Sequence, residues 1–444
     1  MKLICFLLLL LPLSTIAQKN DRPTFDSYMI SQEKFKDFSG TVLVAKNGKI
    51  LYEKGFGLAD REWQIPNTVQ TKFQIGSITK QFTAAAILQL AEAGRLNVQD
   101  KLSKYFPSFP KADSVTIHML LTHTSGIRNY TDVPEFWKLA TINLEKDSML
   151  SLFEKQRYDF LPGTKWNYSN TGYFLLGMII EKVSGKSYSD YLMENVLNKA
   201  GLTNTFLNRW DTIVPQRAHG YMKNNKQWLN AMYISMDAPF SAGALLSTVS
   251  DLYKWNNALF SGKIISPASF SSMIRPYMEH YGYGIGIDSM TNHLRIGHSG
   301  GIPGFVSYMA RFPDDSLVVI CLSNNSSNAS GVANGLAAIA LGMYVTNAYN
   351  HVEVYIDSSK LTAYAGNYSL VNGGKLTIIR KGNKLYRARA NNDIELKPEA
   401  INKFFYGDDS DRQIEFILDK SGMPKQAWFI SGGIKEEMTI VSNK

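Results

Sequence analysis

Apolar residues recur at steps of three and four along residues 77–93, a spacing that places them on one face of a helix. The residues with this spacing are Ile78, Phe82, Ala85, Ala86 and Leu90. Gly94 follows at the position of a C-terminal cap, so the pattern predicts a helix from Ser77 to Ala93. A serine therefore begins this helix, and Lys80 lies one turn further along the same face.

Two β-rich runs precede this helix, at residues 40–45 and 50–55, and the Asn-Gly pair between them is typical of a hairpin turn. After the helix, a long and mostly helical segment extends to about residue 200. Helical patterns are also found at residues 117–121, 174–183 and 332–348, and strand patterns at residues 305–312 and 317–322. The chain up to about residue 350 is therefore predicted to combine strands with helices.

The pattern changes after a polar joint near residues 357–360, where short β-rich runs follow one another. They lie at residues 376–380, 385–389, 394–397, 404–406, 414–418, 427–430 and 438–441. Gly-Asn and Ser-Gly pairs between the runs are typical of hairpin turns. This spacing predicts a small antiparallel barrel, and the sequence favours one filled by its own side chains over one that holds a ligand.

The first 17 residues have the composition of a secretory signal peptide. Lys2 is the only charge, residues 3–11 are apolar, and small residues stand at positions 15 and 17. We therefore expect an exported protein, periplasmic or secreted, with one domain at residues 18–350 and the barrel at 358–444. The apolar run is too short to span a bilayer, so we expect no stable membrane insertion; an uncleaved anchor is the alternative.

Charge and cysteine content narrow the class of protein. Removal of Lys2 lowers the formal net charge from +9 to +8, and basic residues are scattered among acidic ones, which argues against nucleic-acid binding. Cys321 is the only cysteine beyond the signal segment, so no internal disulfide is expected. His118 and His123 are five residues apart, the wrong spacing for two ligands on one helix face. We interpret both as structural and predict no metal and no cofactor.

Ser77 and Lys80 are the first candidates for chemistry. A serine hydroxyl is a poor nucleophile until a base takes its proton, and a desolvated lysine can be that base. The helix N-terminus around Ser77 also favours developing negative charge. The alternative is that Ser77 is an ordinary N-cap, and the same spacing occurs in Ser31-x-x-Lys34 within a polar segment. Spacing alone leaves both interpretations open.

Tyr168 and Asn170 are the second pair of candidates. They stand two residues apart in a loop between Leu161-Pro162-Gly163 and the helical run at 174–183. Both side chains can therefore point into one cleft. An aromatic-rich loop before a helix also occurs for packing alone, so this pair is a weak signal when taken by itself.

The stretch Gly297-His298-Ser299-Gly300-Gly301 also matches the Gly-x-Ser-x-Gly nucleophile elbow of α/β-hydrolases. An elbow must be followed by a helix, but a Pro-Gly turn and a strand pattern follow here. The elbow mechanism also needs an acid and then a histidine after the serine, and His351 is the only histidine left. We therefore reject Ser299 as a nucleophile.

Three motifs occur in the order Ser77-x-x-Lys80, Tyr168-x-Asn170 and His298-x-Gly300. This order resembles the serine β-lactamase and penicillin-binding protein superfamily, and most closely its class C β-lactamase-like branch, which includes D-stereospecific peptidases and esterases. Residues 117–126, 241–248 and 283–286 are similar to the same branch. The resemblance extends over about residues 37–348, and residues 364–368 resemble the start of the lipocalin-like domains appended to some members.

The resemblance implies an α+β fold, in which an antiparallel sheet flanked by helices faces a helical lobe across a cleft. It implies that Ser77 is acylated by the substrate and that Lys80 is its base. Tyr168 would relay the proton to the leaving group. Backbone N–H groups of Ser77 and Gly301 would form the oxyanion hole, where one donor typically contributes about 10²–10³ in rate.

Asn170 would bind the acyl-side amide of the substrate, and His298 and Gly300 would line the substrate site. The chain departs from the pattern at His298, because many members carry lysine there. A lysine is a permanent charge suited to a substrate carboxylate, whereas histidine is largely neutral at pH 7. This departure weakens the case for β-lactam or terminal-carboxylate substrates and leaves the Ser77 and Lys80 chemistry unchanged.

The sequence thus predicts an exported serine hydrolase that cleaves an amide or ester of a small molecule or short peptide, with cell-wall fragments among the candidate substrates. A peptidoglycan D,D-carboxypeptidase or a class C-type β-lactamase is the alternative within the same chemistry. A catalytically idle module that only binds ligands is the alternative from another class. The presence of Lys80, Tyr168 and Asn170 argues against the idle module, since a site that has lost its catalytic activity need not keep these residues. The sequence gives no oligomeric state.

Overall fold

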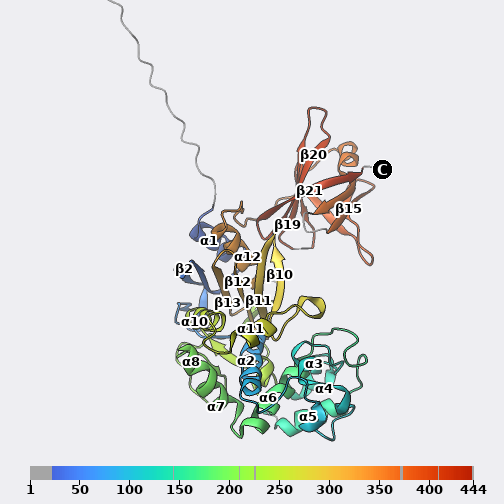
Figure 1. Cartoon of the computed structure of the whole chain (residues 1–444). Coiled ribbons are helices and arrows are strands. Elements are labelled where there is room, and N and C mark those ends of the chain that lie inside the picture. The colour runs from blue at the N-terminus through green and yellow to red at the C-terminus, as the bar shows by residue number, and fades with distance from the viewer. Residues whose placement is uncertain are drawn as a thin grey trace, which may run out of the picture.

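A computed structural model of the chain describes residues 23–143, 145–209, 211–224, 227–370, 374–408 and 410–442. The predicted signal segment at residues 1–17 lies outside these ranges. We call residues 23–341 the main body, and it is followed by a barrel (Figure 1). Within the described ranges no helix is long and apolar enough to cross a bilayer.

A six-stranded antiparallel sheet forms the centre of the main body, in the order β10-β11-β12-β13-β1-β2. Its strands are β1 (Gly40–Lys46), β2 (Lys49–Phe56), β10 (Gly286–Met290), β11 (His293–Ile302), β12 (Phe305–Phe312) and β13 (Leu317–Ser323). The predicted hairpin is β1–β2, with positive φ at both turn residues, Asn47 and Gly48. Because β1 pairs with β13, the two ends of the main body meet in one sheet.

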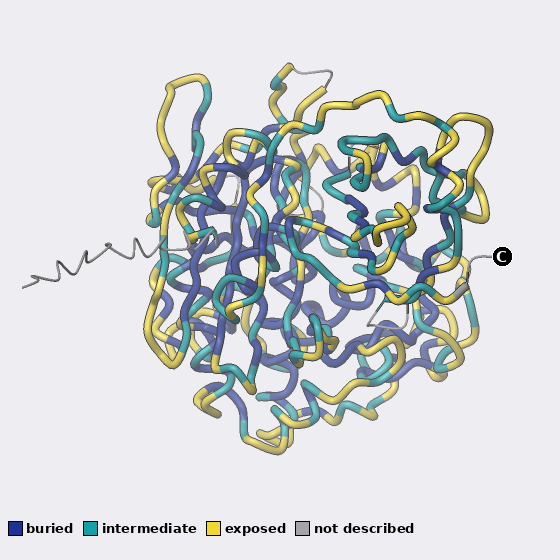
Figure 2. Tube along the Cα trace, turned by 90° about the horizontal axis from the view of Figure 1, so that it is seen from above, coloured by how far each residue is buried: buried dark blue, intermediate teal, exposed yellow. Residues whose placement is uncertain are grey.

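Helices cover both faces of this sheet, as the alternation of apolar residues along each strand requires. Leu43 of β1 packs into the core that contains α2 (Thr79–Glu92) and α10 (Val249–Phe260). Val44 packs on the opposite side, against α1 (Phe25–Lys36) and α12 (Ala329–Ala340). The result is a layered α/β/α arrangement whose buried segments lie at its centre (Figure 2).

A helical lobe lies beside the sheet, at the lower right of Figure 1. It consists of α3 (Ile117–Leu121), α4 (Pro134–Leu139), α5 (Lys146–Glu154) and α6 (Asn170–Ser184). Further helices are α7 (Tyr188–Leu192), α8 (Asn198–Ala200), α9 (Phe240–Gly243) and α11 (Pro267–Met273). Small sheets are formed by β3 (Leu58–Asp60), β4 (Ile65–Pro66), β5 (Phe73–Gln74), β6 (Phe206–Leu207), β7 (Tyr221–Asn224), β8 (Gln227–Asn230) and β9 (Leu245–Ser247). The α+β fold expected from the resemblance is confirmed.

The C-terminal part is a closed antiparallel barrel of eight strands, β14 to β21. They are β14 (Gly366–Leu370), β15 (Lys375–Lys381), β16 (Lys384–Arg387), β17 (Ile394–Ala400), β18 (Lys403–Tyr406), β19 (Arg412–Leu418), β20 (Pro424–Ser431) and β21 (Ile434–Ser442). Its core is filled by side chains such as Tyr364, Phe404 and Phe416, whose rings contact one another. The sequence pattern predicted the later seven strands but not β14.

The barrel contacts the main body next to α1. Lys36 forms an ion pair with Asp411, with Nζ and Oδ1 2.9 Å apart, and the hydroxyl of buried Tyr28 donates to the carbonyl of Gly432. The connecting segment is tied to the barrel by a backbone hydrogen bond from Thr346 to Gly433. The domain limits at 350 and 358 stay a prediction.

Two predicted helices differ in length from those observed. The helix expected at residues 332–348 is α12, which ends at Ala340 because Gly342 adopts a left-handed conformation with φ +76°. The helix expected from Ser77 begins instead with a 3-10 turn, η1 (Gly76–Ile78), before α2. This tighter turn places Ser77 just ahead of the α-helix.

Candidate active site

Ser77 and Lys80 lie side by side at the start of α2. The Ser77 hydroxyl is 3.0 Å from the Lys80 amine, as the one-turn spacing predicts. Lys80 is fully buried, and burial lowers its pKa well below the usual value, because the charged form loses its hydration. An uncharged amine at neutral pH is the form that can accept a proton.

The Lys80 amine has two further partners, both hydrogen-bond acceptors. It lies 2.7 Å from Oδ1 of Asn170 and 2.8 Å from the backbone carbonyl of Ala242. Ala242 belongs to the short helix α9, within the stretch at 241–248 that supported the resemblance. That stretch therefore provides a fixed acceptor beneath the amine.

Tyr168 stands at the same centre. The Lys80 amine lies over its ring, 4.8 Å from the ring centre. Burial raises the pKa of Tyr168, while a hydrogen bond with the Ser77 hydroxyl opposes the rise. The phenol is therefore protonated at neutral pH and in contact with Ser77, so it can pass a proton but does not start as a phenolate.

The middle residue of the Tyr168-Ser169-Asn170 motif explains how its neighbours are aimed. The buried Ser169 donates its backbone N–H to Nδ1 of His123, and its hydroxyl donates to the carbonyl of Ile127. With Ser169 anchored inward, Tyr168 and Asn170 are free to face Ser77 and Lys80. His123, expected to be structural, is the anchor.

Asn129 is a buried residue that sequence reasoning missed. Its Oδ1 accepts hydrogen bonds from the backbone N–H of Asn170 at 3.0 Å and from the Asn170 side-chain amide at 3.2 Å. These contacts fix which end of the Asn170 amide faces Lys80. No pattern around Asn129 distinguishes it from an ordinary loop asparagine, so the sequence offered no signal.

Strand β11 provides the other wall of the site. Gly300 fits only because it lacks a side chain, since a Cβ there would stand 2.0 Å from the carbonyl oxygen of Ile75. A Cβ on Gly76 would likewise stand 2.7 Å from the Gly301 nitrogen, so η1 and β11 are in direct contact. The backbone of Gly301 is thereby brought next to Ser77. Ser299 lies inside β11 rather than at a strand-to-helix turn, in keeping with its rejection as a nucleophile.

His298 is held by a residue that was not singled out from the sequence. Its Nε2 lies 2.8 Å from the hydroxyl of Tyr281, and its Nδ1 contacts the carbonyl of Ser299. Burial, and secondarily the charge of Lys80, lower the pKa of His298 to about 4. The imidazole is therefore uncharged at neutral pH.

The sequence profile of the family described as Beta-lactamase matches residues 32–343, which is most of the chain. The chain belongs to the beta-lactamase family. It is therefore a serine hydrolase with the β-lactamase/transpeptidase-like fold.

Relatives within the beta-lactamase family cover the chain to different extents. Penicillin-binding protein 4* of Bacillus subtilis strain 168 is 30% identical over an alignment of 431 residues, and the match covers 88% of this chain and 94% of the relative. An octameric penicillin-binding protein homologue from Pyrococcus abyssi superposes with a TM-score of 0.67 at 26% identity, covering 94% of this chain and 99% of that one. The D-amino acid amidase from Ochrobactrum anthropi SV3 gives 0.62 at 25% identity, covering 71% and 99%.

A hollow of about 490 Å³ lies in the main body, and some of its lining residues are close to site residues along the chain. Its lining includes Gln74, three residues before Ser77, and Pro303, two residues after Gly301. The exposed side chain of Tyr233 also lines it. Ser77, Lys80, Tyr168 and Asn170 are not among its lining residues.

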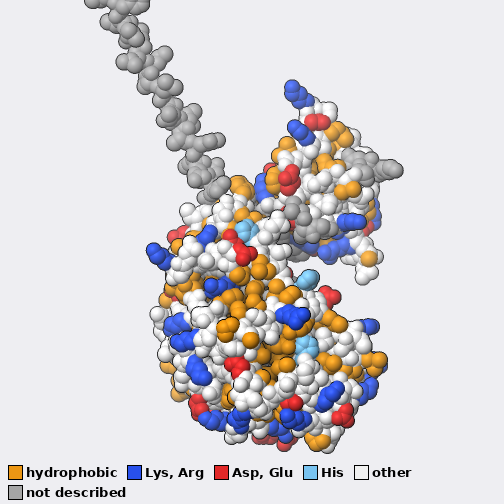
Figure 3. Space-filling view, in the orientation of Figure 1, with side chains coloured by type: hydrophobic (Ala, Val, Ile, Leu, Met, Phe, Trp, Pro, Cys, Tyr) orange, Lys and Arg blue, Asp and Glu red, His pale blue; other side chains and the backbone are white. Residues whose placement is uncertain are grey.

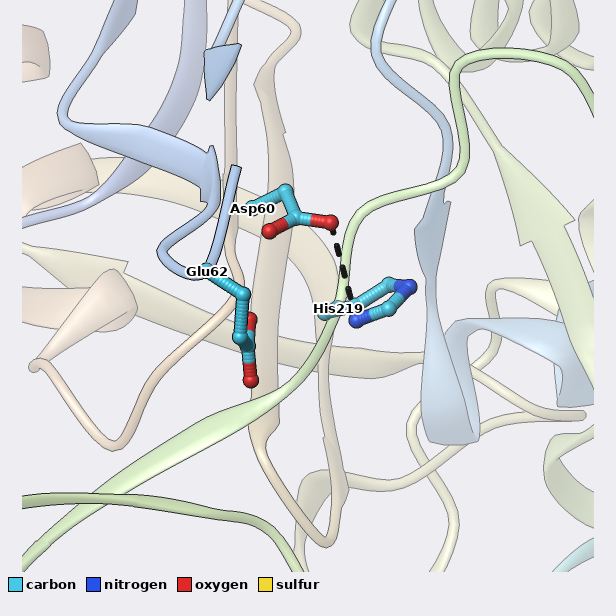
Figure 4. A group of neighbouring side chains, drawn as sticks. All are labelled: Asp60, Glu62 and His219. Atoms are coloured by element: carbon cyan, nitrogen blue, oxygen red, sulfur yellow. Dashed lines mark ion pairs between the residues drawn. The ribbon is translucent and has the colours of Figure 1, made fainter. Parts of the chain in front are cut away.

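A separate group of possible metal ligands lies at the surface (Figure 4). Asp60 and His219 form an ion pair with Oδ2 and Nδ1 3.9 Å apart, and Glu62 offers a third ligand atom within 4.8 Å of both. Both carboxylates already accept hydrogen bonds, from the Trp63 backbone and from the Tyr221 hydroxyl. The expectation that the chain binds no metal stays a prediction, and the chemistry below uses none of these residues.

Basic and acidic side chains are interspersed over the main body on the face shown in Figure 3. The field on this face is mixed in sign, unlike the single-sign stripe that attracts nucleic acid. This agrees with the scattered charges of the sequence.

Proposed function

We propose that Ser77 is the nucleophile of an acyl-transfer site that hydrolyses amides or esters. The observation that carries this proposal is the set of partners around the Lys80 amine. An uncharged amine has two N–H donors and one lone pair. Asn170 Oδ1 and the Ala242 carbonyl can only accept, so they take the two N–H donors. The lone pair is left facing the Ser77 hydroxyl at 3.0 Å, in position to remove its proton.

In this scheme Ser77 attacks the substrate carbonyl while Lys80 takes the hydroxyl proton. The negative oxygen that forms is stabilised by the backbone N–H groups of Ser77 and Gly301. Tyr168 passes the proton from Lys80 to the departing amine or alcohol, and the acyl group stays on Ser77. Water then releases the acyl group by the reverse sequence of proton transfers. The chemistry needs no added cofactor.

Two features support a substrate that is uncharged next to the scissile bond. His298 replaces the lysine common in the superfamily, and it is buried and uncharged. The D-amino acid amidase neighbour acts, by its name, on amides. We therefore favour a D-stereospecific peptidase or esterase activity on small molecules or short peptides.

A penicillin-recognising activity is the second candidate, because the relative that covers 88% of this chain is named a penicillin-binding protein. A D,D-carboxypeptidase or β-lactamase would use the same Ser77 chemistry and would act on cell-wall fragments or β-lactams. The composition of residues 1–17 supports export, which would bring the site to such substrates.

The test is to trap the acyl-enzyme and map it. A fluorophosphonate and a labelled penicillin should each attach to the peptide containing Ser77. Ser77→Ala should lower turnover of a p-nitrophenyl ester by at least about 10³, whereas Ser299→Ala, the matched control on β11, should cost far less. Label on Ser299 would refute the assignment. Faster turnover of penicillin than of the neutral ester would move the proposed function to β-lactamase.

A further inference from the structure

Both ring nitrogens of His298 are occupied by protein groups. The Ser299 carbonyl beside Nδ1 can only accept a hydrogen bond, so Nδ1 must carry the proton of the uncharged ring. Nε2 is then the acceptor nitrogen. The Tyr281 hydroxyl, 2.8 Å away, donates a hydrogen bond to Nε2. The tautomer of His298 is therefore fixed by its two partners.

The surroundings of His298 also keep the ring uncharged. It is 8% exposed, and the titratable groups that face it among the described residues are Lys80, His123, Tyr168 and Tyr281. None of these is a carboxylate that could stabilise an imidazolium. The charged form of Lys80 disfavours it further, so protonation of His298 is opposed by burial and by charge.

Tyr281 is itself held firmly. Its backbone pairs with Gly286 and donates to the carbonyl of Met278. Its ring is buried and contacts His123 with the ring centres 4.7 Å apart. Burial raises the pKa of Tyr281 well above its ordinary value. Its hydroxyl therefore stays protonated and can donate a hydrogen bond to His298.

We propose that Tyr281 is a positioning residue, which locks His298 in the uncharged Nδ1–H tautomer and so makes the site select against substrates with a carboxylate beside the scissile bond. This inference rests on the proposed function. A carboxylate that approaches this wall finds no N–H donor on the imidazole, because the single N–H is spent on Ser299 and Nε2 is covered by the Tyr281 hydroxyl. A lysine at the same position would present a permanent charge instead.

Removal of the Tyr281 hydroxyl should reverse this selection. Tyr281→Phe keeps the ring and its aromatic contacts but leaves Nε2 of His298 without a donor. The neutral ring loses a stabilising hydrogen bond, so the pKa of His298 rises. Once protonated, Nε2–H can donate to a substrate carboxylate. The gain should therefore be seen as a lower KM for acidic substrates, and it should grow as pH falls.

The experiment compares D-alanyl-D-alanine with D-alanyl-D-alanine amide, two substrates that differ only in the carboxylate. We expect the wild type to prefer the amide from pH 5.5 to 8. In Tyr281→Phe the ratio of kcat/KM values should move toward the acid by at least about tenfold at pH 5.5, with a much smaller change at pH 8. An unchanged ratio at both pH values would overturn the inference.

The matched control is Tyr277→Phe. The Tyr277 hydroxyl binds Tyr283 and the Ser272 carbonyl rather than His298, and its ring stacks on Tyr283. The Tyr277→Phe substitution removes a hydroxyl from a nearby tyrosine without touching His298. Its ratio of kcat/KM values for the two dipeptides should therefore equal that of the wild type. An equal shift in both variants would show a general loosening of the wall and would refute a specific role for Tyr281.

A spectroscopic readout separates this inference from the proposed function. In wild-type protein labelled with ¹⁵N-histidine, the His298 signals, assigned by their loss in His298→Gln, should show a protonated Nδ1 and an unprotonated Nε2 at pH 7. An Nε2–H tautomer would overturn the inference even if the enzyme is active. If neither dipeptide nor the p-nitrophenyl ester is cleaved, the proposed function fails, while the tautomer is still read directly.

Discussion

Alanine at Gly76 should disable the oxyanion hole while leaving the chain folded. Gly76 has φ +51°, and a Cβ there would lie 2.7 Å from the Gly301 nitrogen and 3.1 Å from the Gly301 oxygen. Both of these atoms are backbone, so strand β11 must shift. Left-handed backbone costs alanine about 1–2 kcal/mol, which a domain of this size tolerates. Displacing one oxyanion donor typically costs about 10²–10³ in kcat, or about 3–4 kcal/mol in the barrier.

The matched control for this substitution is Gly94→Ala at the other end of α2. Gly94 has φ +66°, and a Cβ there would meet nothing within 4 Å, so this variant bears the backbone strain without touching β11. Steady-state kinetics on a p-nitrophenyl ester and a thermal melt should be measured for both. We expect both variants to lose stability, with the larger loss in Gly76→Ala because of the clash with β11, and we expect a loss of kcat in Gly76→Ala alone. Equal activities would refute the placement of Gly301 as an oxyanion donor.

Three further results follow from the site. Lys80→Arg retains a cation that cannot deprotonate, so ester turnover should fall nearly as far as in Lys80→Ala; substantial activity in the arginine variant would exclude the role of Lys80 as base. The pKa of His298 is about 4 in the folded state and 6.5 in the unfolded state, so between these pH values the folded protein binds fewer protons at this residue. The free energy of unfolding should therefore fall as pH falls from 6.5 to 4. At pH 5 this residue should lower the free energy of unfolding by about 2 kcal/mol relative to neutral pH, and urea unfolding of His298→Gln should not show this decrease. The same acid sensitivity in wild type and variant would contradict a buried, uncharged ring. His298→Lys should raise kcat/KM for a penicillin relative to a neutral ester, and an unchanged ratio would count against this position as the contact for a substrate carboxylate.

Much of the fold was readable from local patterns. The β1–β2 hairpin carries an Asn-Gly turn, and the buried strand β13 is a continuous apolar run. Strand β11 was not predicted, because three glycines within residues 297–301 lower its propensity for strand. It is a strand because β10 and β12, its neighbours along the chain, pair with it on both sides, and this pairing outweighs the low intrinsic propensity.

The candidate site, like the fold, was predicted only in part from the sequence. Ser77, Lys80, Tyr168 and Asn170 were predicted from the order and spacing of their motifs and from the family resemblance, and the structure brings their side chains together. Asn129 and Tyr281 escaped notice because their importance lies in one long-range contact each, to Asn170 and His298. A polar or aromatic loop residue carries no mark of such a partner until the chain is folded.

The pairing of β1 with β13 has a consequence for the order of folding. Gly40 lies opposite Ser323, and Gly76 lies against Gly301, so the sheet and the reactive centre both join segments that are far apart along the chain. Bringing such distant segments together costs conformational entropy before the stabilising contacts between them form, and this slows folding. A growing or truncated chain that stops before β11 would contain Ser77 and Lys80 yet lack Gly301, the proposed second oxyanion donor. We therefore expect the proposed reactive centre to form late, when the last strands of the sheet are in place.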